Sequence, residues 1–395
     1  MRIAAPPGHI MFILNRLASE GHDAFLVGGC VRDSVMKRPV HDWDLATSAT
    51  PVDVARLFPK TVLTGEKFGT VTVVLPDGAV EVTTFRTDGE YIDGRHPEKV
   101  EFASNINEDL SRRDFTINAM AESAEGELID PFGGMDDVNN GIIKCVGGPN
   151  TRFSEDALRM FRAFRFSAEF GFLIETETMH AIYANAGSAS RISAERIRIE
   201  LEKTLMSPKP EITGEMIKIG LLEKFLTASG KNPEGLEKIA KLPLEPMLRW
   251  CAFCAILLDK QHIRSGMEFL HDMRFDGKTT KTCSRALSIR DLPDDKIAIK
   301  RLISKNDANI LRASAAVRDV LGAGNILGSV NKILNSGECA TYDELAVTGY
   351  DLVELGYLPG RQIGETLGKL LEHVIKNPED NTYDTLLSLV KTGVL

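Results

Sequence analysis

Short runs of apolar and β-branched residues alternate with helical patterns over the first 150 residues of the chain. The runs AFLVGG, DWDLAT, GTVTVVL, AVEVTTF and ELIDPF predict strands. Two of these runs flank a Pro-Asp-Gly turn at 76–78 and predict a hairpin. Thr50 and Pro51 suit an N-cap and a first helical position, so they predict a helix over PVDVARLF. The N-terminal IMFIL run predicts an amphipathic helix with Arg16 and Glu20 outside, and it lacks a signal-peptide pattern.

Beyond about residue 150 the strand patterns end and helical patterns follow. Residues 154–170 and 193–206 have apolar positions at helical spacing, and each stretch begins with a serine of N-cap type, Ser154 and Ser193. The remainder offers only helices separated by turns. The sequence therefore predicts an α/β head with a small mixed sheet, followed by an all-α elongated extension. We expect four parts: a head at 1–150, a helical neck at 151–205, a helical body at 206–310 and a helical tail at 311–395.

Composition narrows the class of protein. The 395 residues are 43% hydrophobic and 26% charged, which is close to the globular average and excludes a collagen-like or disordered chain. A net charge of −9 excludes a uniformly basic coat for nucleic acid but permits a local basic groove. Every apolar stretch is far shorter than a membrane span. We therefore expect a cytoplasmic protein with no membrane contact, and we predict no stable protein partner.

The six cysteines are too few and too scattered for a disulfide framework. Cys251 and Cys254 form a C-x-x-C motif, but the sequence has no second such motif and no histidine pair at metal spacing to complete a zinc site. We interpret both as small apolar residues of a buried helix.

The densest candidate chemistry begins at a pair of glycines within residues 25–48. Gly28 and Gly29 end an apolar strand and begin a helical segment that carries Arg32 about one turn in. A glycine pair at this junction lets backbone N–H groups approach a phosphate, and the helix N-terminus adds positive potential. A lone Gly-Gly pair is more often a tight turn, so the motif acquires meaning only from its surroundings.

Three acids supply those surroundings. Asp42 and Asp44 flank Trp43 in a strand-like run, and alternate side chains of a strand project to the same face. Two such carboxylates repel each other unless a cation lies between them, and their hard oxygens suit Mg²⁺. Glu81 begins another predicted strand, which would bring a third carboxylate if the strands are neighbours. A solvated strand edge is the alternative for the acid pair.

These motifs together resemble one family. GG-x-VRD, DWDLATSATP, EVTTFRTDGEYIDGRHPEKVEF, EDLSRRDFTINAM and EDALRMFRAFRF resemble, in the family's order, the class II tRNA CCA-nucleotidyltransferases. Those enzymes share a polymerase-β-like head with the bacterial poly(A) polymerases. The strong resemblance covers roughly residues 23–205, and the later helices match only in general character.

The resemblance implies roles for individual residues. Asp42 and Asp44 correspond to the metal-binding acids, and Glu81 falls at the third carboxylate. The expected nucleotide contacts, several of them to the triphosphate, are Gly28, Gly29, Arg32, Arg113, Asp156, Arg159, Arg162 and Arg165. Among these, Asp156 and Arg159 correspond to the protein template that selects the incoming base. The implied cofactor is Mg²⁺.

The chemistry of Asp156 and Arg159 agrees with that role. A carboxylate only accepts hydrogen bonds and a guanidinium only donates them. Cytosine and adenine each present an amine donor beside a ring-nitrogen acceptor, whereas uracil and guanine present the opposite polarity. If the two residues are neighbours on a helix, the pair accepts C and A and rejects U and G. An ordinary surface ion pair at i, i+3 is the alternative.

The resemblance therefore predicts template-independent addition of C, C and A to tRNA 3′ ends from CTP and ATP, by two-metal nucleotidyl transfer that releases pyrophosphate. The tail and body would hold the tRNA acceptor arm. Residues 87–101 are expected to form a mobile loop, which in this family accompanies full CCA or A-only addition. An A-adding enzyme, a poly(A) polymerase and a catalytically silent RNA-binding protein stay open as alternatives.

Overall fold

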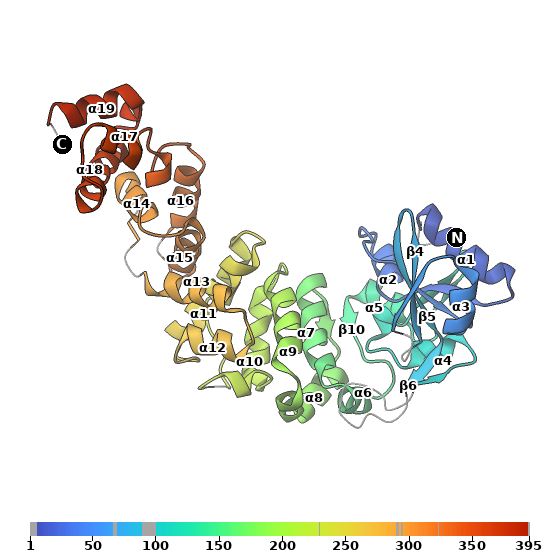
Figure 1. Ribbon diagram of the computed structural model, residues 1–395. Coiled ribbons are helices and arrows are strands. Elements are labelled where there is room, and N and C mark those ends of the chain that lie inside the picture. Colours follow the sequence, from blue (N-terminus) through green and yellow to red (C-terminus); the bar gives the residue numbers. More distant parts are fainter. Residues whose placement is uncertain are drawn as a thin grey trace. The chain divides into compact units, whose positions relative to one another are not determined.

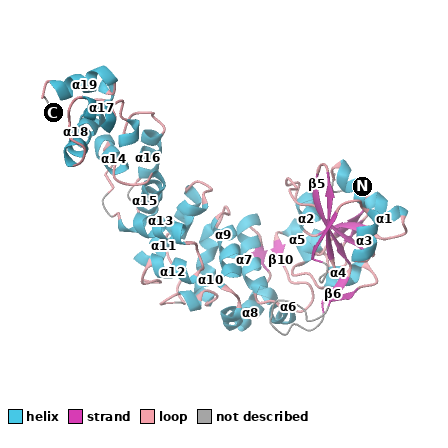
Figure 2. Cartoon of the chain, in the orientation of Figure 1, coloured by secondary structure: helices cyan, strands magenta, loops and turns pink. Residues whose placement is uncertain are grey.

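The computed structural model describes residues 6–65, 69–88, 100–228, 230–289, 292–293, 295–322 and 324–393. The chain forms two compact units, residues 1–224 and 225–395. The first contains strands and helices, and the described part of the second contains helices without strands (Figures 1 and 2). The predicted order of a mixed α/β head followed by helices is confirmed. The four-part division is finer than these two units and stays a prediction.

A seven-stranded mixed sheet forms the core of the first unit. Its strands follow the order β3-β4-β5-β2-β1-β8-β9. Strand β2 runs parallel to β5, whereas β1 is antiparallel to both β2 and β8. The strands of this sheet are β1 (Ala24–Val27), β2 (Asp44–Thr47), β3 (Thr61–Gly65), β4 (Thr70–Leu75), β5 (Gly78–Thr84), β8 (Ala121–Ser123) and β9 (Leu128–Ile129).

The predicted hairpin is present as β4 and β5. Leu75 pairs with Gly78 across the turn, and the buried pairs Val71–Val82 and Val73–Val80 give one face of the hairpin to the core. The β-branched residues therefore alternate as the sequence indicates, with one set buried.

Helices cover the sheet where the sequence predicted them. In α1 (Gly8–Ser19), Ile10, Leu14 and their apolar neighbours are buried, while Arg16 and Glu20 form an exposed ion pair of 3.0 Å. Helix α3 (Pro51–Leu57) begins with the predicted Thr50 cap, which accepts the N–H of Asp53. The other helices of the head are α2 (Gly29–Val35), α4 (Ile106–Ser111) and α5 (Gly134–Asn140).

A second pair of strands flanks the expected loop. Strands β6 (Arg86–Asp88) and β7 (Val100–Phe102) pair antiparallel. Residues 89–99 lie outside the described part of the chain, so the loop expected at 87–101 is described only at its two ends.

The helical neck differs from the sequence-based prediction in one respect. The predicted helix over 154–170 is two helices, α6 (Pro149–Glu155) and α7 (Leu158–Phe170), with Asp156 extended between them at φ −144° and ψ 103°. Ser154 therefore lies inside α6 and is not a cap; its hydroxyl donates to the Thr151 carbonyl. The break arises where the Asp156 carboxylate accepts the N–H of Leu158 and starts a new helix.

The remaining neck elements complete the first unit. Ser193 occupies the predicted N-cap position of α9. These elements are β10 (Ile142–Ile143), β11 (Leu173–Ile174), α8 (Thr176–Asn185), α9 (Ala194–Leu205) and α10 (Thr213–Ile219). Helices α7 and α9 pack together, so residues far apart in the sequence meet beside the head.

The second unit consists of helices throughout its described residues. Cys251 and Cys254 lie fully buried in the first of them, as predicted for core positions. In the described residues, no helix is both long enough and apolar enough to cross a membrane. The helices are α11 (Pro246–Asp259), α12 (Gly266–Asp272), α13 (Gly277–Ser288), α14 (Lys296–Ile303), α15 (Ala308–Val320), α16 (Ile326–Leu334), α17 (Gly349–Glu354), α18 (Arg361–Lys376) and α19 (Tyr383–Lys391).

Candidate active site

Two predicted acids meet on neighbouring strands. Asp44 is the first residue of β2, and Glu81 lies directly opposite it on the parallel strand β5, so their side chains share a face of the sheet. The sequence suggested that strand alternation places Asp42 on this face too. Asp42 precedes β2, however, so strand alternation does not place it there. The three residues are all exposed to solvent at this end of the sheet.

Their charges converge on Asp44. The surrounding protein removes water from the Asp44 carboxylate and thereby raises its pKa. The negative charges of Glu81 and Asp42 raise this pKa further, whereas the positive charge of Arg113 lowers it. Neighbouring like charges disfavour ionisation of the Asp44 carboxylate. A cation held between the acids would relieve that repulsion.

The donor set fits a divalent ion that also has other ligands. Among the described residues, no three His, Cys, Asp or Glu side chains form a ready-made metal cage. Mg²⁺ commonly binds through one or two carboxylates and completes its shell with water and substrate phosphates. Paired acids that leave room for other ligands are consistent with that mode of binding.

The two glycines border the acids. Strand β1 ends at Val27, and Gly28, at φ +74°, leads into α2. A Cβ on Gly28 would lie 2.6 Å from Nη1 of Arg113. The backbone conformation thus favours glycine, and a larger residue would also displace this guanidinium from its present position. The strand–glycine–helix junction predicted from sequence is confirmed.

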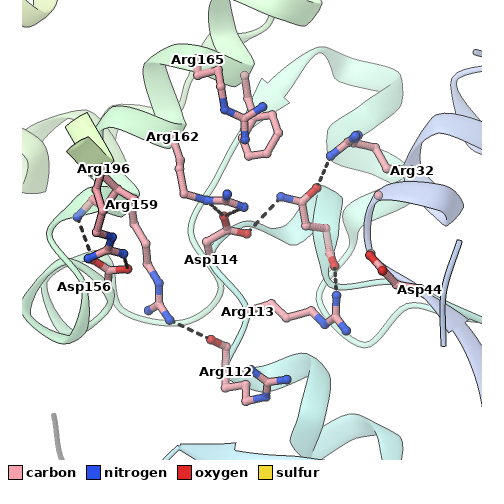
Figure 3. A pocket seen from close by; sticks show the side chains of 15 residues that line it. Arg32, Asp44, Arg112, Arg113, Asp114, Asp156, Arg159, Arg162, Arg165 and Arg196 are labelled. Atoms are coloured by element: carbon pink, nitrogen blue, oxygen red, sulfur yellow. Dashed lines mark hydrogen bonds and ion pairs between the residues drawn. The ribbon is translucent and has the colours of Figure 1, made fainter. Parts of the chain in front are cut away.

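A basic pocket of about 520 Å³ lies beside Asp44 (Figure 3). Seven arginines and three aspartates line it, a strong local excess of positive charge in a chain of net charge −9. Asp44 lies on one side, Asp156, Arg159 and Arg196 lie on the other, and Asp114 and Arg162 lie between them. The charged lining residues are Arg32, Asp44, Arg112, Arg113, Asp114, Asp156, Arg159, Arg162, Arg165 and Arg196.

A chain of hydrogen bonds connects Arg162 to Arg32 across this pocket. Asp114 accepts Nε of Arg162 at 2.7 Å and Nδ2 of Asn118 at 3.0 Å. The Asn118 amide oxygen in turn accepts Nη1 of Arg32 at 2.5 Å. Burial alone would raise the pKa of Asp114, but the Arg162 charge and the Asn118 amide hold that pKa well below its ordinary value. The ionised Asp114 therefore joins neck helix α7 to the head.

The expected base-selecting residues occupy one wall but not one helix. Asp156 precedes α7 and forms an ion pair of 2.7 Å with Arg196 of α9. Arg159, in the first turn of α7, forms an ion pair with Glu155 and donates to the Arg112 carbonyl at 3.1 Å. Both side chains are thus held by other parts of the neck and head. The prediction that Asp156 and Arg159 are i, i+3 neighbours on one helix is wrong, because Asp156 is extended and lies before the start of α7.

Arg162 and Arg165 differ in their partners. Burial would lower the pKa of Arg162, but the Asp114 charge raises it above its ordinary value. Arg165 is 7% exposed, and its Nε donates to Glu200 at 2.5 Å while Nη1 donates to Glu169 at 3.1 Å. The Arg162 side chain is 33% exposed and that of Arg165 only 9%, so Arg162 is the more accessible of the two.

Sequence reasoning missed four polar lining residues. Arg112, Asp114 and Asn118 lie inside the quoted EDLSRRDFTINAM motif but had no assigned role, so the motif itself was the available signal. Arg196 had no such signal, because it reaches the pocket from α9 only through helix packing.

Comparisons with known proteins cover nearly the whole chain. Three family models match in succession: the Poly A polymerase head domain at 24–144, the probable RNA and SrmB-binding site of polymerase A at 171–229, and the putative tRNA nucleotidyltransferase domain 2 at 247–390. Curated relatives include the CCA-adding enzyme of Bacillus velezensis, 38% identical over 92% of both chains. The CCA-adding enzyme of Limosilactobacillus fermentum is 35% identical over 95% of this chain and 94% of its own.

Solved structures match over similar lengths. The Bacillus stearothermophilus CCA-adding enzyme in complex with CTP is 33% identical, with a TM-score of 0.75 and 98% of each chain covered. The Thermotoga maritima CCA-adding enzyme complexed with tRNA is 21% identical, with a TM-score of 0.71 over 98% of this chain and 96% of its own, and supports the fold alone.

Proposed function

The chain belongs to the family of CCA-adding enzymes, and from this premise we propose that it completes tRNA 3′ ends by adding C, C and A from CTP and ATP without a nucleic-acid template. The observation that carries the proposal is the pocket that seven arginines line together with Asp44. Guanidiniums bind the oxygens of a triphosphate, and nucleotide transfer uses carboxylates beside the triphosphate to hold metal ions.

Divalent metal ions serve nucleotidyltransferases of this kind, and we assign Mg²⁺ to Asp42 and Asp44, with Glu81 beside them. When bound, the ions supply activation of the terminal ribose hydroxyl and neutralisation of charge on the departing pyrophosphate. The role of Asp44 and Glu81 is to hold negative charge on one face of the sheet, next to the pocket.

The arginines bind and orient the triphosphate in this proposal. Arg113 lies against Gly28, where a missing Cβ leaves space for its guanidinium, and Arg32 is held by Asn118 at the same end of the pocket. Arg162 lies nearer the neck. Guanidiniums fixed by buried partners bind phosphate oxygens with little loss of side-chain entropy.

Asp156 and Arg159 select the base in this proposal. Their opposed hydrogen-bonding polarity matches the Watson–Crick edges of cytosine and adenine. Arg196 holds the Asp156 carboxylate, and Glu155 holds the Arg159 guanidinium, so both groups are oriented before a nucleotide arrives. The helical second unit would bind the acceptor arm of the tRNA, largely by shape and backbone contacts. We place this activity in the cytoplasm.

One assay tests the function. The purified chain would be incubated with tRNAs that end before, within and after the CC, and with labelled CTP or ATP, in Mg²⁺ or in chelator. Two C additions followed by one A, lost in chelator, are expected. Long adenylate tails would identify a poly(A) polymerase, A addition only to tRNA ending in CC an A-adding enzyme, and no incorporation a silent RNA-binding protein.

A further inference from the structure

Two phenylalanines of α7 form a stacked pair beside the pocket. The rings of Phe166 and Phe170 are 5.6 Å apart and inclined by 13°. Phe166 is 3% exposed and lines the pocket, and its ring also meets the edge of Phe115 at 5.9 Å.

Arginines from two parts of the chain surround these rings. The guanidinium of Arg165 lies 3.9 Å from the centre of the Phe166 ring, and that of Arg162 lies 5.3 Å from it. Arg32, from α2 in the head, lies 5.2 Å from the centre of Phe166 and 4.7 Å from that of Phe170. These contacts therefore bridge the head and the neck.

Arg38 extends the same contact. It follows α2, and its guanidinium lies 4.8 Å from the centre of the Phe170 ring. Arg38 also forms an ion pair of 3.4 Å with Glu169, the residue before Phe170. Two arginines of the head, Arg32 and Arg38, thus lie against the Phe170 ring of the neck.

The face of an aromatic ring attracts cations because its electron density lies above and below the ring plane. A guanidinium held by its flat face keeps its in-plane N–H groups for other partners. Arg32 directs some of these groups to Asp33 and Asn118, and further donors stay available to a phosphate. An aliphatic side chain could fill the same space but would not attract these charges.

We propose that Phe166 and Phe170 are positioning residues for the triphosphate: their ring faces hold Arg32 against the neck and aim the guanidiniums of Arg32 and Arg162 into the pocket. The inference rests on the proposed function for the identity of the ligand, a nucleoside triphosphate. The transfer reaction itself is not required for it.

Fluorination provides the test, because it withdraws electron density from a ring and changes its shape little. Mono-, di- and trifluorophenylalanine would be inserted in turn at 166 or at 170 of the full chain, and the Kd of CTP and of ATP would be measured by calorimetry in Mg²⁺ without tRNA. We expect the Kd of both nucleotides to rise with each added fluorine, by about 3- to 30-fold at the trifluoro stage. The Kd of tRNA should stay constant, and the unfolding temperature should fall only slightly, because the fold loses the same weak attraction between rings and cations.

Two matched variants separate ring electrostatics from packing. Trifluorophenylalanine at Phe253, which is buried against Trp250 and Phe269 in the second unit, should leave the Kd of CTP unchanged. Phe170→Tyr keeps the ring face and should bind CTP like the unmodified chain, whereas Phe170→Leu should bind it as weakly as the trifluoro form. A Kd that stays within about twofold through the whole fluorine series would overturn the proposal and leave the rings as packing groups.

Failure of the proposed function gives a different result. An unmodified chain that binds CTP and ATP but adds neither to tRNA would contradict CCA addition, while the fluorine series would still decide the role of the rings. An unmodified chain that binds neither nucleotide would overturn both proposals.

Discussion

Asp44 and Glu81 lie directly opposite each other on the parallel strands β2 and β5, at the edge of a pocket lined by seven arginines. The Glu81 charge contributes to the raised pKa of Asp44. The fold thus holds negative charge beside a positively charged pocket, an arrangement that suits a metal-bound triphosphate.

Asp44→Asn should abolish nucleotide transfer without loss of tRNA binding, because it removes a proposed metal ligand and little volume. Mutation of a residue that only hydrogen-bonds to a metal ligand lowers metal affinity or activity by about 10- to 100-fold. Asp44 is proposed as a ligand itself, so we expect kcat for CTP and ATP incorporation to fall by at least about 100-fold. Asp77→Asn, in the exposed turn between β4 and β5, is the control and should keep normal activity. Substantial turnover by Asp44→Asn would remove this residue from the metal site.

Gly28→Ala should weaken the binding of both nucleotides, because the new Cβ would lie 2.6 Å from Nη1 of Arg113. We expect KM for CTP and ATP to rise about 10-fold through displacement of this guanidinium. Gly21→Ala is a close control: Gly21 has a similar φ of +83°, but its Cβ would meet nothing within 4 Å. Both variants should lose stability from the positive φ, and Gly28→Ala should lose more, because its ψ of −123° lies outside the left-handed helical region. Only Gly28→Ala should change KM. Equal KM values for the two variants would contradict the assignment of Arg113.

Arg196→Met should relax base selection, because it removes the ion pair that orients Asp156. The ratio of kcat/KM for CTP over UTP, and for ATP over GTP, should fall by about 10-fold, which corresponds to the loss of one well-placed hydrogen bond. Arg191→Met, at an exposed position before α9, serves as the control. If the ratios stay constant in Arg196→Met, Asp156 does not depend on this partner for its role.

Asp114→Asn should lower stability at neutral pH and change its dependence on pH. The pKa of Asp114 is held below the ordinary value of 3.8, so its ionised form stabilises the fold above that pH, and the contribution is lost as the pH falls below about 4 towards the folded-state pKa. At pH 7 the variant should lose about 1–3 kcal/mol, because Arg162 loses a charged partner. Urea titrations followed by circular dichroism should give a shallower decline of stability with acid for Asp114→Asn than for Asp77→Asn. Parallel declines would mean that folding does not lower the pKa of Asp114.

Local sequence was sufficient for several of the structural elements. The Thr50 cap, the Pro-Asp-Gly turn and the Gly28–Gly29 junction depend on the conformations of residues close in the chain, and each occurs where it was predicted. Family-like motifs pointed to nine of the pocket's lining residues before any spatial arrangement was known.

Only the tertiary structure decided how distant residues meet. Nothing local specifies that β2 pairs with β5 so that Glu81 faces Asp44, since strand register follows from the packing of the whole sheet. The break at Asp156 was missed because a helical pattern of apolar residues continues through it, while the extended backbone is stabilised by the Leu158 N–H and by Arg196 of another helix. The contact of Arg32 with Phe166 and Phe170 joins the head to the neck in the same way. Sequence determined which groups this protein possesses, and long-range packing determined which of them act together, because side chains far apart in the chain become neighbours only through the fold.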